Sequence, residues 1–520
     1  MQIFRKKGLK KLPTVLASVL LSGALLAGTT VTAFAATDVN HSAVNDASQS
    51  KGGIFYTDYA TPDDLMDAAK ELAEEISEEG MVLMQNKDNA LPLQKGMRVS
   101  VFGKSSVNPA YGGGGSGALI GVTPVSLYEG LQNAGFKTNG VLEAFYNNDL
   151  LSGSGRSDKT YVNETPVSAY TAGITSSYSA YGDAAIVVIT RTGAEGSDLP
   201  RTGNAAYDEG ARYLSITQDE KDLIGHVNEY FDKVIVLVNS SNTVELGDIK
   251  DDVDSILWVG NPGERGFNAV GRILNGEVNP SGRLADVYVS DLTMDPTWAN
   301  FGNNSQNKGV EVYTKSTDRN GKLVYAKETV LYNALHAAET ADGSQKLSDG
   351  TAIPAGTQIY EKGGTYTEYE EGIYVGYRYY ETRAYEMGDQ GAAWYDGLVD
   401  FTFGHGESYT TFSQEWAETP DVELTKDGSV TLKVKVTNTG DVAGKEVVQL
   451  YYSAPYFEEG IEKSVVNLGA YAKTDILAPG GSETVTLTMK VQDMASFDWN
   501  DANGNGFCGY ELEAGNYSFI

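Results

Sequence analysis

The sequence predicts two domains in series: an α/β sandwich domain with a largely parallel sheet flanked by helices, followed by an all-β sandwich. Three observations carry this prediction. The chain has 520 residues, more than one hydrophobic core usually serves. Continuous apolar runs alternate with helical patterns over residues 61–285, which is typical of α/β layers. From Val422 onward, apolar and polar residues alternate as they do in half-buried strands.

The α/β domain is expected over residues 61–290. Thr61 caps a helical pattern that runs to Glu79, with Pro62 in its first turn. Four apolar runs rich in β-branched residues then read as strands buried on both faces. They occupy residues 99–102, 184–189, 234–238 and 255–259. Helical patterns over residues 217–231 and 266–274 alternate with the later runs, which favours a parallel sheet.

The rest of the chain changes character twice. Asn, Gly, Tyr and Thr dominate residues 291–417 with little periodicity, so we expect a loop-rich connector there. Residues 418–520 contain three alternating runs separated by turn signals such as Pro479-Gly480-Gly481. This spacing predicts the all-β sandwich, and we expect it to be incomplete because the sequence stops inside an apparent strand at residues 517–520.

The N-terminus has the order of a secretory signal. A basic stretch over residues 5–11 precedes an apolar run, and Ala33-Phe34-Ala35 supplies a cleavage site. We therefore expect a signal peptide over residues 1–35, a polar segment over residues 36–60, and a secreted or cell-surface protein. The alternative is an uncleaved anchor, but no second apolar span of about 20 residues follows, so we expect no membrane span after cleavage.

Charge and cysteine content exclude several classes of partner. The formal net charge is −31, which disfavours nucleic acid and anionic membranes. Cys508 is the only cysteine and the four histidines are scattered, so we expect no metal and no cofactor. The string Asp501–Gly506 looks like the start of a calcium loop, but Leu512 stands where the bidentate Glu belongs. We interpret it as a turn between strands.

Two loops suggest chemistry. Tyr111 to Gly117 is glycine-rich and follows the first predicted strand; it is either a structural turn or a ligand loop, and it lacks the lysine of a phosphate-binding loop. Glu195 follows the strand at residues 184–189, near Arg191 and Asp198. Loops after parallel strands line the ligand crevice of open α/β sheets. Glu195 is therefore a candidate general acid, with a solvated surface acid as the alternative.

Several segments, in order, resemble glycoside hydrolase family 3, the β-glucosidase and β-xylosidase family. They are the segment Glu79-Gly80-Met81-Val82-Leu83 with Ala90-Leu91-Pro92-Leu93, the glycine-rich loop, the segments at 263–266 and 279–284, the segments at 371–380 and 401–406, and residues 436–452. The resemblance covers about residues 65–520. It implies that the first domain is the accessory catalytic domain of that family and that the last is its fibronectin type III-like domain.

The resemblance also implies site residues. Glu195 maps onto the acid/base carboxylate, and Arg191, Asp198 and Tyr111 onto the surrounding substrate-binding positions. Leu199 stands where the family often has an Arg, so the sugar contact of that Arg is not carried over to this chain. The family's nucleophile is an Asp on a separate (β/α)8 barrel, and no segment here reads as eight strand–helix units. Some relatives place the barrel last, so we expect it downstream or in trans.

The function implied is a retaining, β-glucosidase-like glycoside hydrolase acting on β-linked glucosides or related oligosaccharides. This chain would supply the acid/base half of the site and be inactive without the barrel. The alternative is a non-catalytic exported carbohydrate-binding module built from the same two domains. A nucleotide-binding protein is a third possibility, which rests only on the glycine-rich loop.

Overall fold

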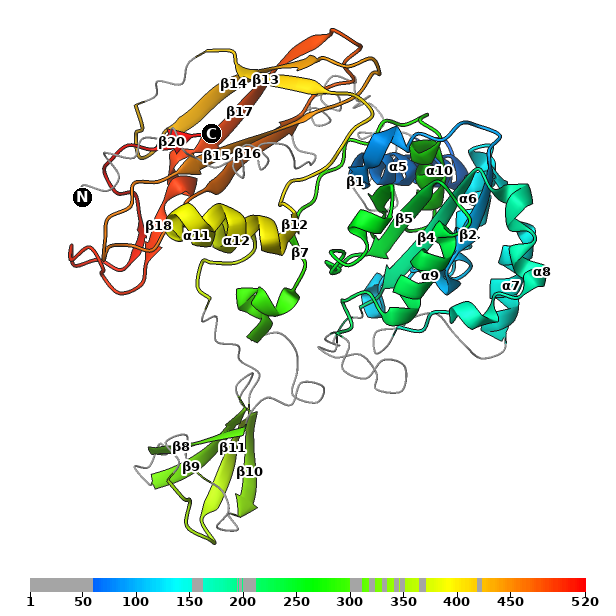
Figure 1. Ribbon diagram of the computed structural model, residues 1–520. Helices are drawn as coiled ribbons and strands as arrows, with labels where there is room; N and C mark the ends of the chain where they lie inside the picture. The colour runs from blue at the N-terminus through cyan, green and yellow to red at the C-terminus, as the bar shows by residue number, and fades with distance from the viewer. Residues whose placement is uncertain are drawn as a thin grey trace, which may run out of the picture.

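The computed structural model describes residues 59–151, 162–193, 195, 199, 212–299, 311–317, 323–329, 334–340, 346, 351–363, 371–418 and 423–520. The predicted signal peptide lies outside these residues and stays a prediction. Figure 1 shows the α/β domain beside an all-β domain, with a separate small sheet at some distance from both. No helix within the described ranges combines the length and the apolar character that a membrane crossing requires.

A six-stranded sheet forms the centre of the α/β domain. Its strand order is β1-β6-β5-β4-β2-β3, and all neighbours are parallel except β1 and β6. The strands are β1 (Val82–Asn86), β2 (Arg98–Phe102), β3 (Lys137–Thr138), β4 (Ala184–Arg191), β5 (Val234–Ser240) and β6 (Ser255–Trp258). The prediction of a largely parallel sheet is confirmed, and every residue of β4 and β5 is buried, as the continuous apolar runs indicated.

Helices cover both faces of this sheet (Figure 1). The helices of this domain are α5 (Pro62–Gly80), α6 (Leu127–Asn133), α7 (Gly140–Leu151), α8 (Ala172–Thr175), α9 (Gln218–Asn228) and α10 (Gly266–Leu274). Helices α6 and α10 share one core with Val101 and Ile186, whereas α7 and α9 share another with Val187. Adjacent residues of a strand point to opposite faces of the sheet, so one buried strand contributes side chains to both cores.

Helix α5 begins as predicted, but its packing differs from the prediction. Thr61 accepts the N–H of Asp64, and the Asp64 carboxylate accepts the N–H of Thr61, which completes a capping box. None of its residues is buried, and Leu72 and Ile76 of the apolar face are about half exposed. Helix α5 contacts the domain along α10, where Asn268 donates to Glu74 at 2.8 Å.

The predicted loop-rich connector contains more regular structure than expected. Strands β8 (Glu311–Thr317), β9 (Leu323–Thr329), β10 (Ala334–Thr340) and β11 (Gln358–Gly363) form a sheet of their own, in the order β10-β11-β9-β8. Helices α11 (Tyr377–Glu386) and α12 (Gly391–Leu398) follow. Strand β12 (Val399–Phe401) then pairs with β7 (Tyr288–Val289). The sequence did not predict these elements, because the region is rich in Tyr and Gly and its strands lack a clear apolar period.

The last domain is the predicted antiparallel sandwich. Its two sheets are β13-β14-β17 and β16-β15-β20, and a β18-β19 hairpin is attached to them. The strands are β13 (Phe412–Trp416), β14 (Ser429–Asn438), β15 (Val447–Ser453), β16 (Asn467–Lys473), β17 (Ser482–Lys490), β18 (Ser496–Asp498), β19 (Gly509–Glu511) and β20 (Ser518–Phe519). Burial alternates strictly along most of β14, so its inward residues fill the core between the sheets.

A buried ion pair joins the two domains. Arg283 lies just before the β7 strand and donates to Glu446 at 2.7 Å, and both side chains are at most 2% exposed. Glu79, at the end of α5, accepts from Lys473 at 2.7 Å and also pairs with Lys445. Because a buried charge without its partner is costly, these contacts favour one relative placement of the two domains.

Candidate active site

The candidate acid Glu195 lies four residues beyond the end of β4. Its carboxylate is exposed and accepts hydrogen bonds from the backbone N–H of Ser116, at 2.8 Å, and from the Ser116 hydroxyl. The hydroxyl and the N–H together hold the pKa of Glu195 below its ordinary value. Donors to a carboxylate stabilise its charged form, so the ionised state is favoured in this chain.

The glycine-rich loop holds Glu195 in place. Gly114 donates its N–H to the carbonyl of Gly193 at 3.1 Å, and Glu195 donates its N–H to the carbonyl of Gly114 at 3.3 Å. Gly115 has a φ of +70°, and a Cβ there would lie 2.6 Å from the Cβ of Glu195. Only glycine fits both the conformation and the approach. The structure shows that this loop contacts the candidate acid, and a contact between the loop and a ligand stays a prediction.

The two loops meet because of strand order. Strands β2 and β4 are parallel neighbours, with Val99 opposite Ala184 and Phe102 opposite Val187. The chain that leaves β2 therefore emerges at the same sheet edge as the chain that leaves β4, where α/β sheets bind ligands.

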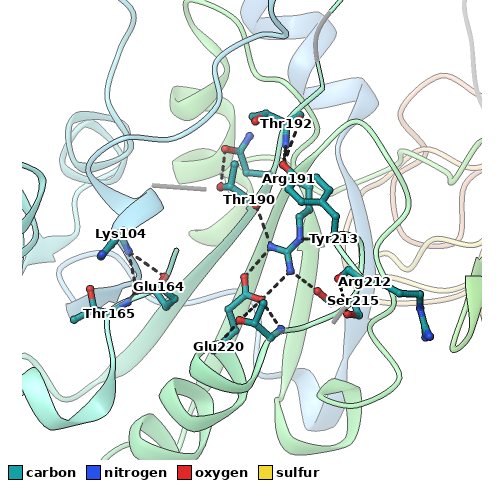
Figure 2. Close-up of polar contacts among 12 residues, drawn as sticks. Lys104, Glu164, Thr165, Thr190, Arg191, Thr192, Arg212, Tyr213, Ser215 and Glu220 are labelled. Atoms are coloured by element: carbon teal, nitrogen blue, oxygen red, sulfur yellow. Dashed lines mark hydrogen bonds and ion pairs between the residues drawn. The ribbon is translucent and has the colours of Figure 1, made fainter. Parts of the chain in front are cut away.

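Arg191, the last residue of β4, is fully buried and points away from solvent (Figure 2). It donates to both carboxylate oxygens of Glu220 at 2.8 Å, and its other three N–H groups meet the backbone carbonyls of Tyr213, Thr190 and Ser215. A guanidinium has five N–H donors, and all five have protein acceptors here. Arg191 thus has no donor left for a sugar, and the substrate-binding role predicted for it does not fit this geometry.

Glu220 also anchors helix α9. The Thr217 N–H donates to the Glu220 carboxylate and the Glu220 N–H donates to the Thr217 hydroxyl, which completes the capping box of that helix. Tyr213 adds a further tie, because its hydroxyl accepts the N–H of Thr192 and donates to the Thr192 carbonyl, each at 3.1 Å. The base of the Glu195 loop is therefore fixed to α9 by Arg191 and Tyr213.

Tyr111 lies at the start of the glycine-rich loop and is half-buried. Its ring packs edge-on against Phe267 with the centroids 5.5 Å apart, and its carbonyl accepts the N–H of Gly263. Burial raises the pKa of the Tyr111 phenol, with the charge of Glu129 adding to the effect. The contact with a sugar predicted for Tyr111 stays a prediction. Asp198 lies outside the described residues.

Asn239, near the end of β5, joins the loops that follow β2 and β6 to the end of β4, and it was not predicted from the sequence. It is fully buried, accepts the N–H of Ala110 at 2.7 Å, and donates to the carbonyls of Ala110 and Gly260 at 2.9 and 2.7 Å. Thr190 of β4 also donates to it. An amide that ends an otherwise apolar strand was the available signal, because buried polar groups require partners.

Glu164 is a second buried carboxyl that the sequence did not point to. It accepts the N–H groups of Lys104 and Thr165, at 3.2 and 2.7 Å, beside the end of β2 (Figure 2). Burial raises the pKa of Glu164 to about 7. Glu164 precedes a Pro-containing stretch without periodicity, so no sequence pattern marked it. Among the described residues, no cluster of three or more His, Cys, Asp or Glu side chains is arranged to hold a metal ion.

Fold and site together define an α/β sandwich protein with an appended fibronectin type III-like domain and a carboxylate at the carboxyl edge of its sheet. The chain belongs to glycosyl hydrolase family 3. The family model for the glycosyl hydrolase family 3 C-terminal domain matches residues 81–377, and the model for the fibronectin type III-like domain matches residues 446–520. The family and both domain types predicted from the sequence are thereby confirmed.

The chain is similar to several proteins named as β-glucosidases, among them proteins of solved structure. β-Glucosidase A of Butyrivibrio fibrisolvens is 32% identical over 491 residues, covering 86% of this chain and 49% of that protein. The β-glucosidase of Ruminococcus albus is 30% identical, covering 86% of this chain and 39% of that protein. The structure of a β-glucosidase from Paenibacillus barengoltzii superposes with a TM-score of 0.64 at 29% identity, covering 86% of this chain and 41% of that one.

β-Glucosidase 3B of Thermotoga neapolitana, solved in complex with α-D-glucose, superposes with a TM-score of 0.61 at 27% identity. That match covers 88% of this chain and 52% of the other. The chain spans about half the length of the curated relatives it matches.

Proposed function

We propose that this chain supplies the acid/base half of the active site of a retaining, β-glucosidase-like glycoside hydrolase, with Glu195 as the acid/base residue. The observation that carries the proposal is the exposed carboxylate of Glu195, held beyond the end of β4 by Ser116 from a loop 79 residues earlier. Family membership and the β-glucosidase relatives support the reaction class. β-Linked glucosides or related oligosaccharides are the proposed substrates.

Retaining hydrolysis requires a second carboxylate about 5–5.5 Å away. In the first step, Glu195 protonates the glycosidic oxygen as the C1–O bond breaks, while the nucleophilic carboxylate of a barrel domain bonds to C1. In the second step, Glu195 takes a proton from water as the water oxygen bonds to C1 and displaces that carboxylate. The barrel lies in the same longer polypeptide or acts in trans.

The low pKa of Glu195 points to a second role for the barrel domain, in addition to supplying the nucleophile. The donors of Ser116 hold the pKa of Glu195 low, whereas the first step needs its protonated form. A like charge within about 5.5 Å raises a carboxyl pKa. The docked nucleophile would thus convert Glu195 from an ordinary surface carboxylate into a proton donor, and the chain alone would hydrolyse aryl β-glucosides only at the background rate.

Arg191 is a positioning residue in this proposal, because it reaches the Glu195 loop only through the backbone. Asp198 and Tyr111 are proposed to contact the sugar.

The test uses the complete enzyme, in which this chain is joined to the domain that supplies the nucleophile. Glu195→Gln is expected to lower kcat/KM on cellobiose by about 10²–10⁴-fold, and to have a smaller effect on aryl glucosides with good leaving groups. Azide should restore turnover to Glu195→Ala and yield a glucosyl azide. Glu75→Gln serves as the matched control, because Glu75 is an exposed carboxylate on α5.

Unchanged kinetics in Glu195→Gln would remove this residue from the site. Robust turnover by the 520-residue chain alone would contradict the proposal that this chain supplies only the acid/base half of the active site. Absence of hydrolysis by the complete wild-type enzyme would favour the non-catalytic carbohydrate-binding module instead.

A further inference from the structure

The β18–β19 hairpin carries an unusual set of exposed rings. This aromatic hairpin, residues 496–511, exposes Trp499 by 72% and Tyr510 by 75%, with Phe497 and Phe507 at 50% and 55%. All large apolar side chains that it exposes are aromatic. Exposed single rings are ordinary on protein surfaces, but a group of them on one short element marks a binding surface.

The strand register brings two of the rings together. Phe497 of β18 lies directly opposite Tyr510 of β19, and their ring centroids are 5.1 Å apart at an interplanar angle of 61°. Trp499 follows β18 directly. Phe507 lies against the backbone of Gly509, where a Cβ would come within 2.7 Å of the ring. Phe497 and Tyr510 therefore lie on one face of the hairpin and form an aromatic platform, and Trp499 and Phe507 are close to them in the chain.

Polar contacts within the loop hold this platform in shape. Asn503 and Asn505 both donate to one oxygen of Glu511, at 2.9 and 2.5 Å. Asp498 accepts the N–H groups of Asn500 and Ala502 at 3.1 and 3.0 Å. The bonds from Asp498 to the backbone and from the two Asn side chains to Glu511 stiffen the turn. A stiff platform loses little conformational entropy when a ligand binds.

We propose that the aromatic hairpin binds the chain of a neutral β-linked glucan. The flat C–H faces of pyranose rings fit aromatic rings, whose faces are apolar and weakly negative. The hairpin has three carboxylates, Asp498, Asp501 and Glu511, and no Lys or Arg, so it repels anionic polymers and leaves a neutral one favoured. The choice of a glucan rests on the proposed function.

The position of the hairpin indicates what such binding does. It lies on the side of the β-sandwich away from the α/β domain (Figure 1). A polymer held there anchors the protein to its polysaccharide and raises the local concentration of chain ends.

Binding is measured without turnover, on the 520-residue chain. The chain is expected to be retarded in native gels that contain soluble mixed-linkage β-glucan, and to be retained on cellulose, but not in gels that contain polygalacturonate. Trp499→Ala and Tyr510→Ala should each weaken binding by about 10-fold. Trp499→Phe should recover much of the loss. Tyr471→Ala is the matched control, because Tyr471 is 42% exposed on β16 of the same domain.

Retention that survives both hairpin substitutions, or that falls equally in Tyr471→Ala, would overturn the proposal. Equal retardation by polygalacturonate would overturn the charge argument, and retention on xylan or mannan alone would overturn the choice of glucan. Circular dichroism and the thermal midpoint verify that each variant is folded. Glu195→Gln should bind glucan like the wild type. Glucan binding by the hairpin would therefore still be expected if Glu195 proved not to be catalytic.

Discussion

At the scale of single residues, the candidate site depends on a glycine as much as on a carboxylate. Glu195 is held by Ser116, but Ser116 can approach only because Gly115 has no side chain and has a φ of +70°. The Glu195 backbone is tied to the same loop through Gly114. The position of the acid is therefore set by residues that carry no chemistry themselves.

Gly115→Ala is predicted to impair catalysis more than stability. The new Cβ would push the Glu195 side chain aside, and a displacement near 1 Å can cost about 100-fold in rate. Activity of the complete enzyme on cellobiose is the measurement. Gly121→Ala provides the control, because Gly121 has a φ of +77° and open space around its Cβ. It shares the backbone strain without the contact, so equal losses in both variants would contradict this explanation.

At the scale of elements, two helices on one face of the sheet pack at backbone distance. A Cβ on Gly130 of α6 would lie 2.1 Å from the carbonyl oxygen of Phe267, and one on Gly271 of α10 would lie 2.4 Å from the carbonyl of Gly130. Both glycines sit inside helices, where glycine is intrinsically unfavourable. Close contact between α6 and α10 is the structural reason for their presence.

Gly130→Ala is therefore predicted to destabilise the protein by about 1–3 kcal/mol, because the helices must separate. The same substitution at Gly225 of α9, where nothing lies within 4 Å, should stabilise it by about 0.5–1 kcal/mol. Urea unfolding of the two variants and the wild type measures both changes. Stabilisation by both substitutions would show that helix propensity, rather than packing, governs Gly130, and destabilisation by Gly225→Ala would contradict the propensity argument.

At the scale of the whole molecule, ion pairs link the two domains, and the α11–α12 segment contains a buried carboxyl group. Arg283 pairs with Glu446 across the domain boundary, and Glu79 pairs with Lys473. In the segment between the domains, Glu381 is buried and accepts a hydrogen bond from the Tyr395 hydroxyl at 2.6 Å. Burial raises the pKa of Glu381 to about 7.

This raised pKa makes stability depend on pH in a definite direction. Between the unfolded pKa near 4.5 and the folded pKa near 7, the folded protein binds more protons, so stability falls as the pH rises. Glu381→Gln keeps the acceptor oxygen and removes the titration. It should gain stability relative to the wild type from pH 5 to pH 8, by up to about 3 kcal/mol. Glu386→Gln, an exposed position on the same helix, should show no such trend; a trend in both would exclude Glu381 as the cause.

Much of the fold was predictable because it follows from local patterns. The buried strands β4 and β5 are continuous apolar runs, and the capping residues Thr61 and Thr217 stand where their helices begin. The strands β8 to β11 were not predicted, because their residues show no clear period. Arg191 was misread for a different reason: an arginine beside a candidate acid looks the same in sequence whether it faces a ligand or a buried Glu220.

The sequence by itself determined the family, the two domain types, the parallel sheet and the candidacy of Glu195, because apolar periodicity and ordered motifs are properties of contiguous residues. Only the tertiary structure decided which residues meet. Ser116 contacts Glu195 because β2 and β4 are parallel neighbours, and Arg191 turns to Glu220 because α9 packs beside the end of β4. Contacts between residues distant in the chain depend on strand order and packing, which no local pattern contains.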